Sequence, residues 1–472
     1  MRRFASLCFL LLAVSLASAA EKPNIVFLFA DDYSYECVGA YGHPMVQTPN
    51  IDQLAKQGTR FTHAYNMGSW SGAVCVASRT MLNTGRFVWN AEKVYKSADQ
   101  ERVAGRFWSE YMKAAGYDTY MTGKWHVPAK ADKAFATSAH IRGGMPNQTE
   151  AGYNRPQADG SDRWSPSDPQ FGGFWAGGKH WSEVVADDAI GFLETAAKQE
   201  KPFFMYLAFN AVHDPRQSPQ EYVDRYPVSK TDVPADFMPE YPEKEAMGAG
   251  KGLRDEKLAP FPRTRHSIQV HRSEYYAIIE HMDVQVGRIL DALKATGKAD
   301  NTYVFFTADH GLACGHHGLL GKQNMYDHSV RVPLIVAGPG LPQGKVCEVP
   351  VYLQDVMATA LEVAGVEKPE HVEFRSLLPV IAGEREVQYD AIYGAYLNKQ
   401  RMITADGYKL ILYPTIAKLK LFHLTDDPQE QQDLAAKPEQ RERISALLQQ
   451  LIGLQAELGD QLDLKKPYGD WL

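Results

Sequence analysis

The stretch Asn24-Ile25-Val26-Phe27-Leu28-Phe29-Ala30 forms an apolar run that ends directly at Asp31-Asp32. A run that lacks alternation between polar and apolar residues is typical of a strand buried on both faces of a parallel sheet. We therefore expect a central strand at 24–30, with the two acids emerging at its carboxyl end.

Other segments repeat this apolar pattern, and between them lie segments with apolar residues three and four positions apart. The predicted strands are Phe203–Asn210, Thr302–Thr307 and Pro333–Ala337, and the predicted helices include Ser182–Lys198 and Ser273–Ala295. This alternation predicts an α/β fold with a large, mostly parallel central sheet flanked by helices. Ligands bind such sheets beyond the carboxyl ends of the strands, so the polar residues there are the candidate site.

The C-terminal part of the chain has a different pattern, which predicts a second and smaller domain. The chain has 472 residues, and single cores usually stop growing at roughly 250–300 residues. We expect a large domain at 21–385 and, at 386–472, a small antiparallel sheet closed by a helix. The elements predicted there are strands at Ala391–Leu397, Gln400–Thr404 and Tyr408–Tyr413 and a helix at Pro438–Leu458.

Two long segments, 128–180 and 228–266, interrupt the alternation of strands and helices. The first is rich in Gly, Pro, Asn and Asp, and the second contains several prolines and mixed charges. Connections of this length are uncommon unless they are functional. We expect them to shape ligand binding at the strand ends.

Residues 1–20 have the pattern of a secretory signal peptide, with Arg2 and Arg3 before the apolar run Leu7–Leu16 and small residues at 17–19. The alternative, an uncleaved anchor, needs an apolar run of ~20 residues, which is longer than this one. We expect an exported protein, periplasmic or secreted in a bacterium and lysosomal or extracellular in a eukaryote, without stable membrane insertion after cleavage. The formal charge of −7 argues against a nucleic-acid partner.

A second polar pair, Asp309-His310, follows the predicted strand Thr302–Thr307 and Ala308. Two adjacent acids such as Asp31-Asp32 alone also fit a solvated turn or a helix cap. Three carboxylates that meet at one sheet edge would repel one another unless a cation neutralised them. Oxygen ligands favour Ca²⁺, with Mg²⁺ as the alternative, although His310 leaves the identity of the metal open.

Cys75 begins the run Cys75-Val76-Ala77-Ser78-Arg79. A lone cysteine is more often a buried, inert thiol than a nucleophile. A cysteine followed by an arginine also suggests the phosphate loop of tyrosine phosphatases. That loop requires five residues between the two, whereas Arg79 lies only four positions after Cys75, so the spacing excludes it.

The pentapeptide from Cys75 to Arg79 instead resembles the signature Cys-X-Pro/Ala-Ser-Arg of type I, formylglycine-dependent sulfatases, which belong to the alkaline phosphatase-like superfamily. Further segments resemble this family in the same order, and the resemblance covers nearly the whole mature chain. They are Asn24–Asp32, Thr48–Asp52, Phe61–Tyr65, Cys75–Gly85, Gly123–His126 and Ala308–Arg331. Residues 21–385 are accordingly expected to form a sulfatase catalytic domain.

The resemblance implies a role for each candidate residue. Cys75, oxidised to formylglycine by a separate maturation enzyme, would hydrate; one hydroxyl would attack sulfur and the other would later release sulfate. His126 would serve as the base, His213 would contact sulfate or protonate the leaving oxygen, and Arg79 would orient the hydrate. The implied sulfate ligands are Lys124, Lys322 and His317, and the implied metal ligands are Asp31, Asp32, Asp309, His310 and the modified Cys75.

The implied activity is hydrolysis of a sulfate monoester, and the long loops suggest a sulfated sugar or polysaccharide as substrate. Aryl and choline sulfates remain alternatives. A phosphomonoester or phosphonate hydrolase on the same fold is a rival, because a fold does not determine the anion. A catalytically inactive sulfoglycan-binding protein is another. Two positions depart from the common family pattern: Ala77 stands where many members have Pro, and His310 where many have Asn.

Overall fold

Strand β1 (Asn24–Ala30) is fully buried and runs through the middle of a nine-stranded sheet, as its apolar sequence predicts. It pairs in parallel with β8 (Phe203–Ala208) on one side and with β9 (Thr302–Ala308) on the other. The computed structural model describes residues 22–147 and 149–472, so the predicted signal peptide at 1–20 lies outside the described residues.

The central sheet is mostly parallel, but β10 (Arg331–Ala337) runs antiparallel to both β9 and β2 (Thr59–Tyr65). The sequence predicted this strand but not its direction. Between β9 and β10 the longest helix is α11 (Asp327–Val330), and a parallel connection normally needs a longer crossover helix. The strand order is β11 (Lys345–Cys347), β2, β10, β9, β1, β8, β4 (Asp118–Lys124) and β5 (Thr137–Arg142), and β12 (Val351–Tyr352) pairs with β2.

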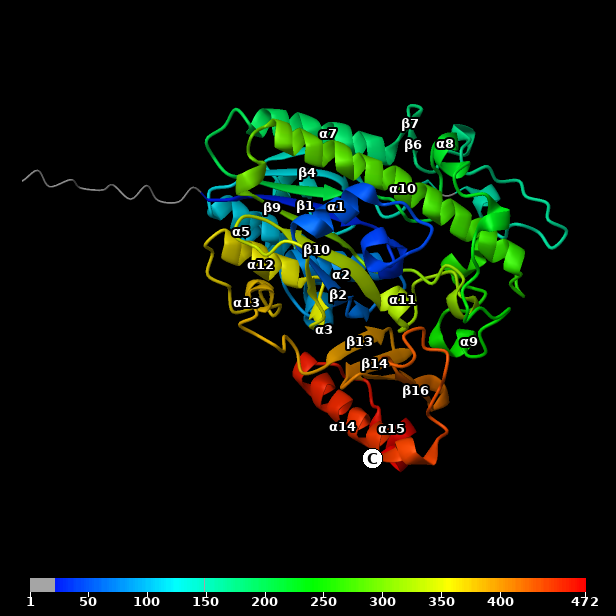
Figure 1. Ribbon diagram of the computed structural model, residues 1–472. Helices are drawn as coiled ribbons and strands as arrows, with labels where there is room; N and C mark the ends of the chain where they lie inside the picture. The colour runs from blue at the N-terminus through cyan, green and yellow to red at the C-terminus, as the bar shows by residue number, and fades with distance from the viewer. Residues whose placement is uncertain (1–21, 148) are drawn as a thin grey trace, which may run out of the picture.

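Helices cover both faces of this sheet (Figure 1). The helices α7 (Trp181–Ala196) and α10 (Arg265–Ala295) lie over one face, and α2 (Val74–Thr84), α5 (Trp108–Ala114) and α12 (Asp355–Val363) lie over the other. Helix α10 begins eight residues before the predicted Ser273. Thr264 and Ser267 form a capping box at this end of the helix. A capping box marks a helix start through polar residues, whereas the prediction used only the spacing of apolar residues.

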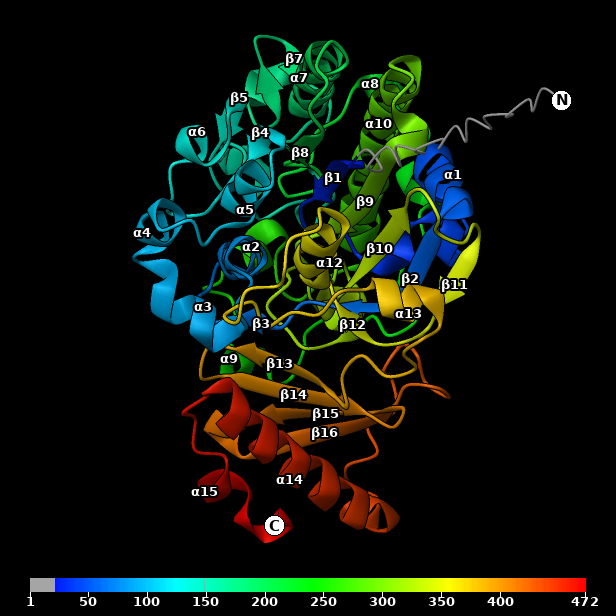
Figure 2. The same cartoon turned by 90° about the vertical axis from the view of Figure 1, so that its left-hand side faces the viewer.

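The C-terminal segment forms the predicted small antiparallel sheet with α14 (Arg441–Leu458) packed against it (Figure 2). Its strands are β13 (Ile392–Tyr396), β14 (Gln400–Ala405), β15 (Tyr408–Tyr413) and β16 (Lys418–His423). A fifth strand, β3 (Gly68–Ser69), comes from the N-terminal part of the chain and pairs in parallel with β13. The segment 59–69 thus contributes β2 to the large sheet and β3 to the small one. A domain boundary at residue 385 stays a prediction.

The segment 128–180 is not only loop. It contains the edge strand β5, whose sequence Thr-Ser-Ala-His-Ile-Arg is largely solvent-accessible, and the hairpin β6 (Trp175–Ala176) and β7 (Lys179–His180). A polar edge strand lacks the apolar run on which the strand prediction depended. Before α10 begins at Arg265, the segment 228–266 contains only short helical turns, such as α9 (Lys244–Met247).

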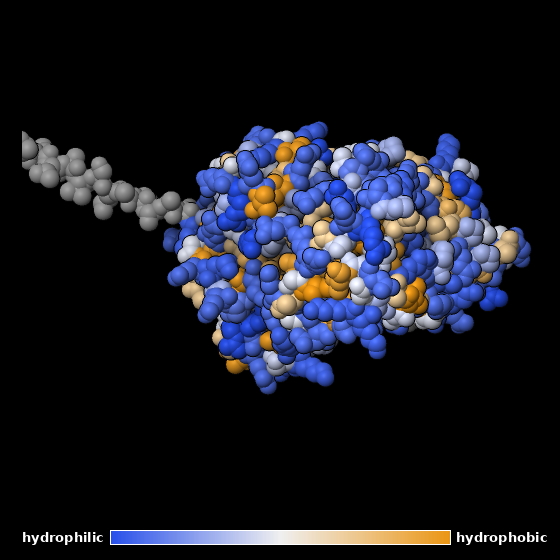
Figure 3. Space-filling view, turned by 90° about the horizontal axis from the view of Figure 1, so that it is seen from below, coloured by the Kyte–Doolittle hydropathy of each residue, from blue (hydrophilic) through white to orange (hydrophobic). Residues whose placement is uncertain are grey.

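The surface of the described chain carries its large exposed apolar side chains at scattered positions. The face shown in Figure 3 is mostly hydrophilic, with small separate apolar groups. Scattered apolar residues of this kind are normal on a folded domain. Among residues 22–147 and 149–472, no helix combines the length and the apolar character needed to span a bilayer.

Gly123 allows β4 to approach β8 closely just before Lys124. Its φ of +91° is in the left-handed region, and a Cβ at this position would lie 1.8 Å from the backbone oxygen of Ala208. We expect Gly123→Ala to lower the free energy of unfolding by about 1–3 kcal/mol or more. The substitution should also reduce activity, because it displaces Lys124. Chemical denaturation and turnover would measure both effects.

Gly191→Ala in α7 is the matched control, because nothing lies within 4 Å of a Cβ at Gly191. Alanine in a helix interior is expected to stabilise by roughly 0.5–1 kcal/mol relative to glycine. Equal stability losses in the two variants would contradict a special role for Gly123.

Candidate active site

The acids predicted from the sequence meet at the carboxyl ends of adjacent strands. Because Ala30 of β1 pairs with Ala308 of β9, Asp31 and Asp309 follow at the same level. The backbone nitrogen of Asp32 donates to Asp309 Oδ1 over 3.2 Å. All three carboxylates are buried.

Two groups of side chains here have the geometry to hold a cation. The ligand atoms of Asp31, Cys75, Asp309 and His310 lie within 4.8 Å of one another, as do those of Asp31, Asp32 and His213. Burial, and then the charge of Asp309, raise the pKa of Asp31 well above its ordinary value. A bound cation would relieve this repulsion.

The orientation of His310 provides a direct test of whether the site fits a metal. Its Nδ1 donates to the carbonyl of Gly311 over 2.8 Å, which turns Nε2 toward the acids, 3.1 Å from Asp32 Oδ1. Asp31 Oδ1 is buried without a hydrogen-bond partner. An unpartnered buried carboxylate oxygen beside two further carboxylates and an imidazole nitrogen fits a divalent cation with mainly oxygen ligands.

Two lysines lie beside the acids, and Arg79 is a third cation that contacts them. Lys124, the last residue of β4, donates to Asp31, and Lys322 Nζ lies 2.8 and 2.7 Å from the two oxygens of Asp32. Although burial opposes its charge, the carboxylates of Asp32 and then Asp255 raise the pKa of Lys322. Lys322 is therefore charged, and both lysines are held beside the acids.

Arg79 is fully buried one turn after Cys75 and connects two parts of the site. Its Nε donates to Asp309 Oδ2 over 2.9 Å and its Nη1 donates to the backbone oxygen of Lys124 over 2.8 Å. It therefore holds the end of β4 against the end of β9. It lies within the predicted site, but it contacts the acids rather than Cys75.

Cys75 lies in the first turn of α2 with its side chain 4% exposed. Its Sγ is 3.2 Å from His126 Nδ1, two residues after the end of β4. Burial alone would raise the pKa of the thiol, but the charge of Lys124 and hydrogen bonds with His126 and His310 hold that pKa well below its ordinary value. A thiol activated in this way is typical of a reactive site rather than a structural cysteine.

His213 completes the group on the side of Lys322. Its Nδ1 donates to the carbonyl of Asp214 over 2.7 Å, which leaves Nε2 to accept from Lys322 Nζ at 3.2 Å. Burial, and then the charge of Lys322, hold the pKa of His213 well below its ordinary value. The imidazole is therefore neutral and faces the other side chains of the site. Together these residues form a cage: Asp31, Asp32, Cys75, Arg79, Lys124, His126, His213, Asp309, His310 and Lys322.

His317 lies apart from this group. Its Nε2 is 3.3 Å from Asp236 and its ring packs 4.0 Å, centroid to centroid, from that of Tyr326. Burial lowers its pKa to about 4. Within the described residues, its recorded ion pair is with Asp236 and not with the cage, so a role in sulfate binding stays a prediction.

The structure adds neighbours that sequence reasoning missed. Asp255 Oδ2 lies 3.9 Å from Lys322 Nζ and accepts from Gln323 at 2.8 Å, and Arg254 donates to Asp214 at 2.6 Å. Asp255 and Arg254 come from the segment 228–266, and no sequence motif surrounds these two residues. The sequence suggested only that this long segment would reach the site, and did not single out either residue.

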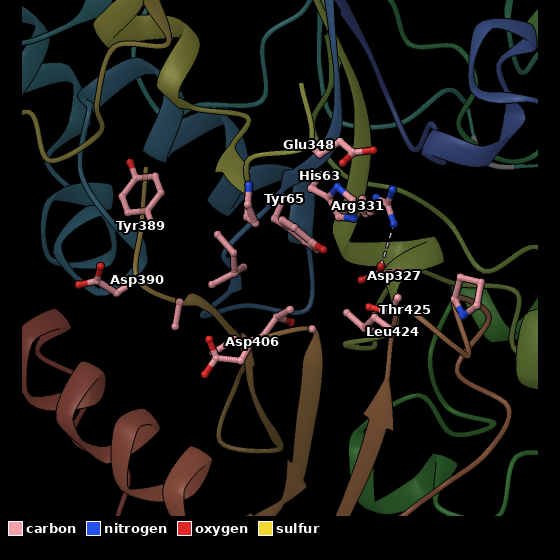
Figure 4. A pocket seen from close by; sticks show the side chains of 17 residues that line it. His63, Tyr65, Asp327, Arg331, Glu348, Tyr389, Asp390, Asp406, Leu424 and Thr425 are labelled. Carbon is pink, nitrogen blue, oxygen red and sulfur yellow. Dashed lines mark hydrogen bonds and ion pairs between the residues drawn. The ribbon is translucent and has the colours of Figure 1, made fainter. Parts of the chain in front are cut away.

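A separate cavity of about 520 Å³ lies between the ends of β2 and β10 and the C-terminal sheet (Figure 4). Glu348, Asp390 and Asp406 lie around it, and its Arg331 is paired with Asp327 at 3.1 Å. Excess carboxylates repel a sulfate ester. The cavity therefore does not compete with the cage around Cys75 as a site for that anion.

This fold, with acids at the ends of adjacent parallel strands beside Cys75 and two lysines, is that of the alkaline phosphatase-like superfamily. The family model described as "Sulfatase" matches residues 23–366, and that described as "N-sulphoglucosamine sulphohydrolase, C-terminal" matches residues 315–457. The chain therefore belongs to the sulfatase family and is a sulfuric ester hydrolase.

Curated relatives and solved structures agree with this family. An arylsulfatase of Clostridium perfringens is 28% identical, covering 91% of this chain and 94% of the relative. An N-acetylglucosamine-6-O-sulfatase of Bacteroides thetaiotaomicron is 25% identical, covering 95% and 90%. A structure solved in complex with its substrate D-glucosamine-2-N,6-O-disulfate has a TM-score of 0.73 at 22% identity over 93% of this chain and 99% of that chain.

A phosphonate monoester hydrolase from Silicibacter pomeroyi has a similar fold, with a TM-score of 0.74 at 20% identity over 93% of this chain and 96% of that chain. Similarity at this level of identity shows the fold alone.

Proposed function

We propose that this protein hydrolyses a sulfate monoester of a sugar or polysaccharide and releases inorganic sulfate, with Cys75 matured to formylglycine and a divalent cation bound beside it. The observation that carries the proposal is the contact of Cys75 with His126, inside a cage that also contains Lys124, Lys322 and His213. Each cage residue has a position that suits one step of ester cleavage.

The lysines and His213 would bind the sulfate group. Lys124 and Lys322 present ammonium groups that the acids hold in place, so they stabilise negative charge without having to reorganise. His213 Nε2 lies 3.2 Å from Lys322 Nζ, so this ring would contact the sulfate or protonate the oxygen of the departing alcohol. Relatives that act on sulfated amino sugars support a carbohydrate substrate.

His126 and Arg79 would position and deprotonate residue 75. The ring of His126 is within hydrogen-bonding distance of the side chain at 75, as a general base requires. Arg79 connects Asp309 with the backbone of Lys124 and so maintains the spacing of the cage.

Asp31, Asp32, Asp309, His310 and the modified residue 75 would hold Ca²⁺, or alternatively Mg²⁺. The cation would supply Lewis-acid polarisation of the nucleophile and the sulfate. The formylglycine hydrate would supply two hydroxyl groups, one to attack sulfur and one to release the sulfate afterwards. Maturation requires a formylglycine-generating enzyme as partner, and export after signal cleavage stays a prediction.

Turnover of matched aryl esters tests this function. We expect protein coexpressed with the maturation enzyme to hydrolyse an aryl sulfate with kcat/KM more than tenfold above that for the corresponding aryl phosphate, a difference of about 1.4 kcal/mol or more in transition-state binding. Intact-peptide mass should show the aldehyde at residue 75. A preference for phosphate would support the phosphonate or phosphate hydrolase instead, and a retained thiol without turnover would support a sulfoglycan-binding protein.

A further inference from the structure

A groove of about 600 Å³ lies beside the loop that leads to Cys75. It is lined by the partly exposed Trp70, Trp89 and Leu397 and by polar and charged residues: Glu92, Lys93, Asn398, Arg401, Asp460 and Gln461. We propose that this groove is a binding subsite for the glycan chain of the substrate, beyond the sugar that carries the reacting sulfate. This inference rests on the proposed function and specifies an oligosaccharide rather than a monosaccharide as substrate.

The chain places this groove close to the reacting centre. Trp70 is five residues before Cys75, so at most about 18 Å of extended chain separates their Cα atoms. The intervening loop is held in place: Ser69 Oγ accepts from the backbone nitrogen of Ser71 at 3.0 Å, and the next serine, Ser71, accepts from the nitrogen of Ala73 at 3.2 Å. A rigid loop of this length keeps Trp70 within reach of a short oligosaccharide bound in the cage.

The turn between β13 and β14 connects the groove with the cage. Leu397 and Asn398 line the groove, whereas Gln400, directly after the turn, donates to the backbone oxygen of Gln323, the residue after Lys322, over 2.8 Å. The backbone nitrogen of Leu397 also donates to Ser69 over 2.9 Å. The groove therefore lies within a short turn of a residue adjacent to the cage.

The groove has the chemistry of a carbohydrate site. Indole faces present flat apolar area at low cost in conformational entropy, which suits the C–H face of a pyranose ring. Trp89 is held in place because its Nε1 donates to Tyr393 at 2.9 Å and the guanidinium of Arg401 lies 4.8 Å from its ring centroid. The amides of Asn398 and Gln461 can both donate to and accept from sugar hydroxyls.

Binding to protein that carries Cys75→Ala tests the subsite without turnover. The probes are sulfated mono-, di- and tetrasaccharides from carrageenan, ulvan and glycosaminoglycans, titrated by calorimetry. In at least one series we expect the tetrasaccharide to bind about tenfold more tightly than the monosaccharide, equivalent to about 1.4 kcal/mol. Adding Trp70→Ala should remove this gain and Trp70→Phe should keep most of it.

The matched control is Trp471→Ala, which replaces a partly exposed tryptophan near the C-terminus. It should leave the tighter binding of the tetrasaccharide unchanged.

In matured protein, Trp70→Ala should lower kcat/KM on the tetrasaccharide and leave aryl sulfate turnover unchanged. The subsite proposal is wrong if no series shows tighter binding with length, or if Trp70→Ala leaves the gain intact. Loss of the proposed function alone would appear differently, as chain-length-dependent binding without any sulfate release.

Discussion

Cys75→Ala is expected to abolish sulfate release, with kcat lowered by roughly 10⁵-fold or more, as removal of a nucleophile does in other hydrolases. The physical reason is that Lys124, Lys322 and His213 would still bind the sulfate, but no group in the cage could attack sulfur. Sulfate release from an aryl sulfate measures the effect. Calorimetric binding of the same ester should survive the substitution.

Cys347→Ala is the matched control, because Cys347 is also a buried free thiol but lies in β11 at the far edge of the sheet. It should lose little activity even if its stability falls. Activity that persists in the Cys75→Ala variant would rule out residue 75 as nucleophile. A Cys75→Ala protein that no longer bound the ester would instead indicate that residue 75 is needed to form the cage.

Removal of the divalent cation is expected to lower both activity and stability. The carboxylates of Asp31, Asp32 and Asp309 are buried together, so a cation that neutralised them would bind the folded state and not the unfolded chain. Ca²⁺ at 100 times its Kd should stabilise the matured protein by about 2.7 kcal/mol. Thermal unfolding with a chelator and after addition of Ca²⁺ or Mg²⁺ measures this difference independently of turnover.

The Asp309→Asn variant should lose most of the metal-dependent rise in Tm. Asp355→Asn is its control, because Asp355 is equally buried but accepts from Tyr389 at 2.6 Å in a different part of the fold. That variant is expected to lose stability but to keep its response to Ca²⁺. An unchanged Tm on addition of either ion to the matured wild type would show that the acids do not form a metal site.

Sequence reasoning predicted those parts of the fold whose signals are local. The apolar runs at 24–30 and 302–307 predicted buried strands, because burial on both faces requires apolar side chains at every position. The polar strand β5 lacked that signal, and so did the capping residues before α10. Motif order predicted the cage residues, and the structure brings ten of them into contact with another cage residue: Asp31, Asp32, Cys75, Arg79, Lys124, His126, His213, Asp309, His310 and Lys322.

By itself, the sequence determined that this protein is an α/β member of the sulfatase family, with Cys75 and the acids after two strands as its candidate centre. Only the tertiary structure decided the antiparallel direction of β10, the contribution of β3 to the second sheet, the contact of His317 with Asp236 and the meeting of Trp70 and Trp89 in one groove. Local patterns report burial and backbone period, whereas these features depend on contacts between residues far apart in the chain. Such contacts are decided by how whole elements pack.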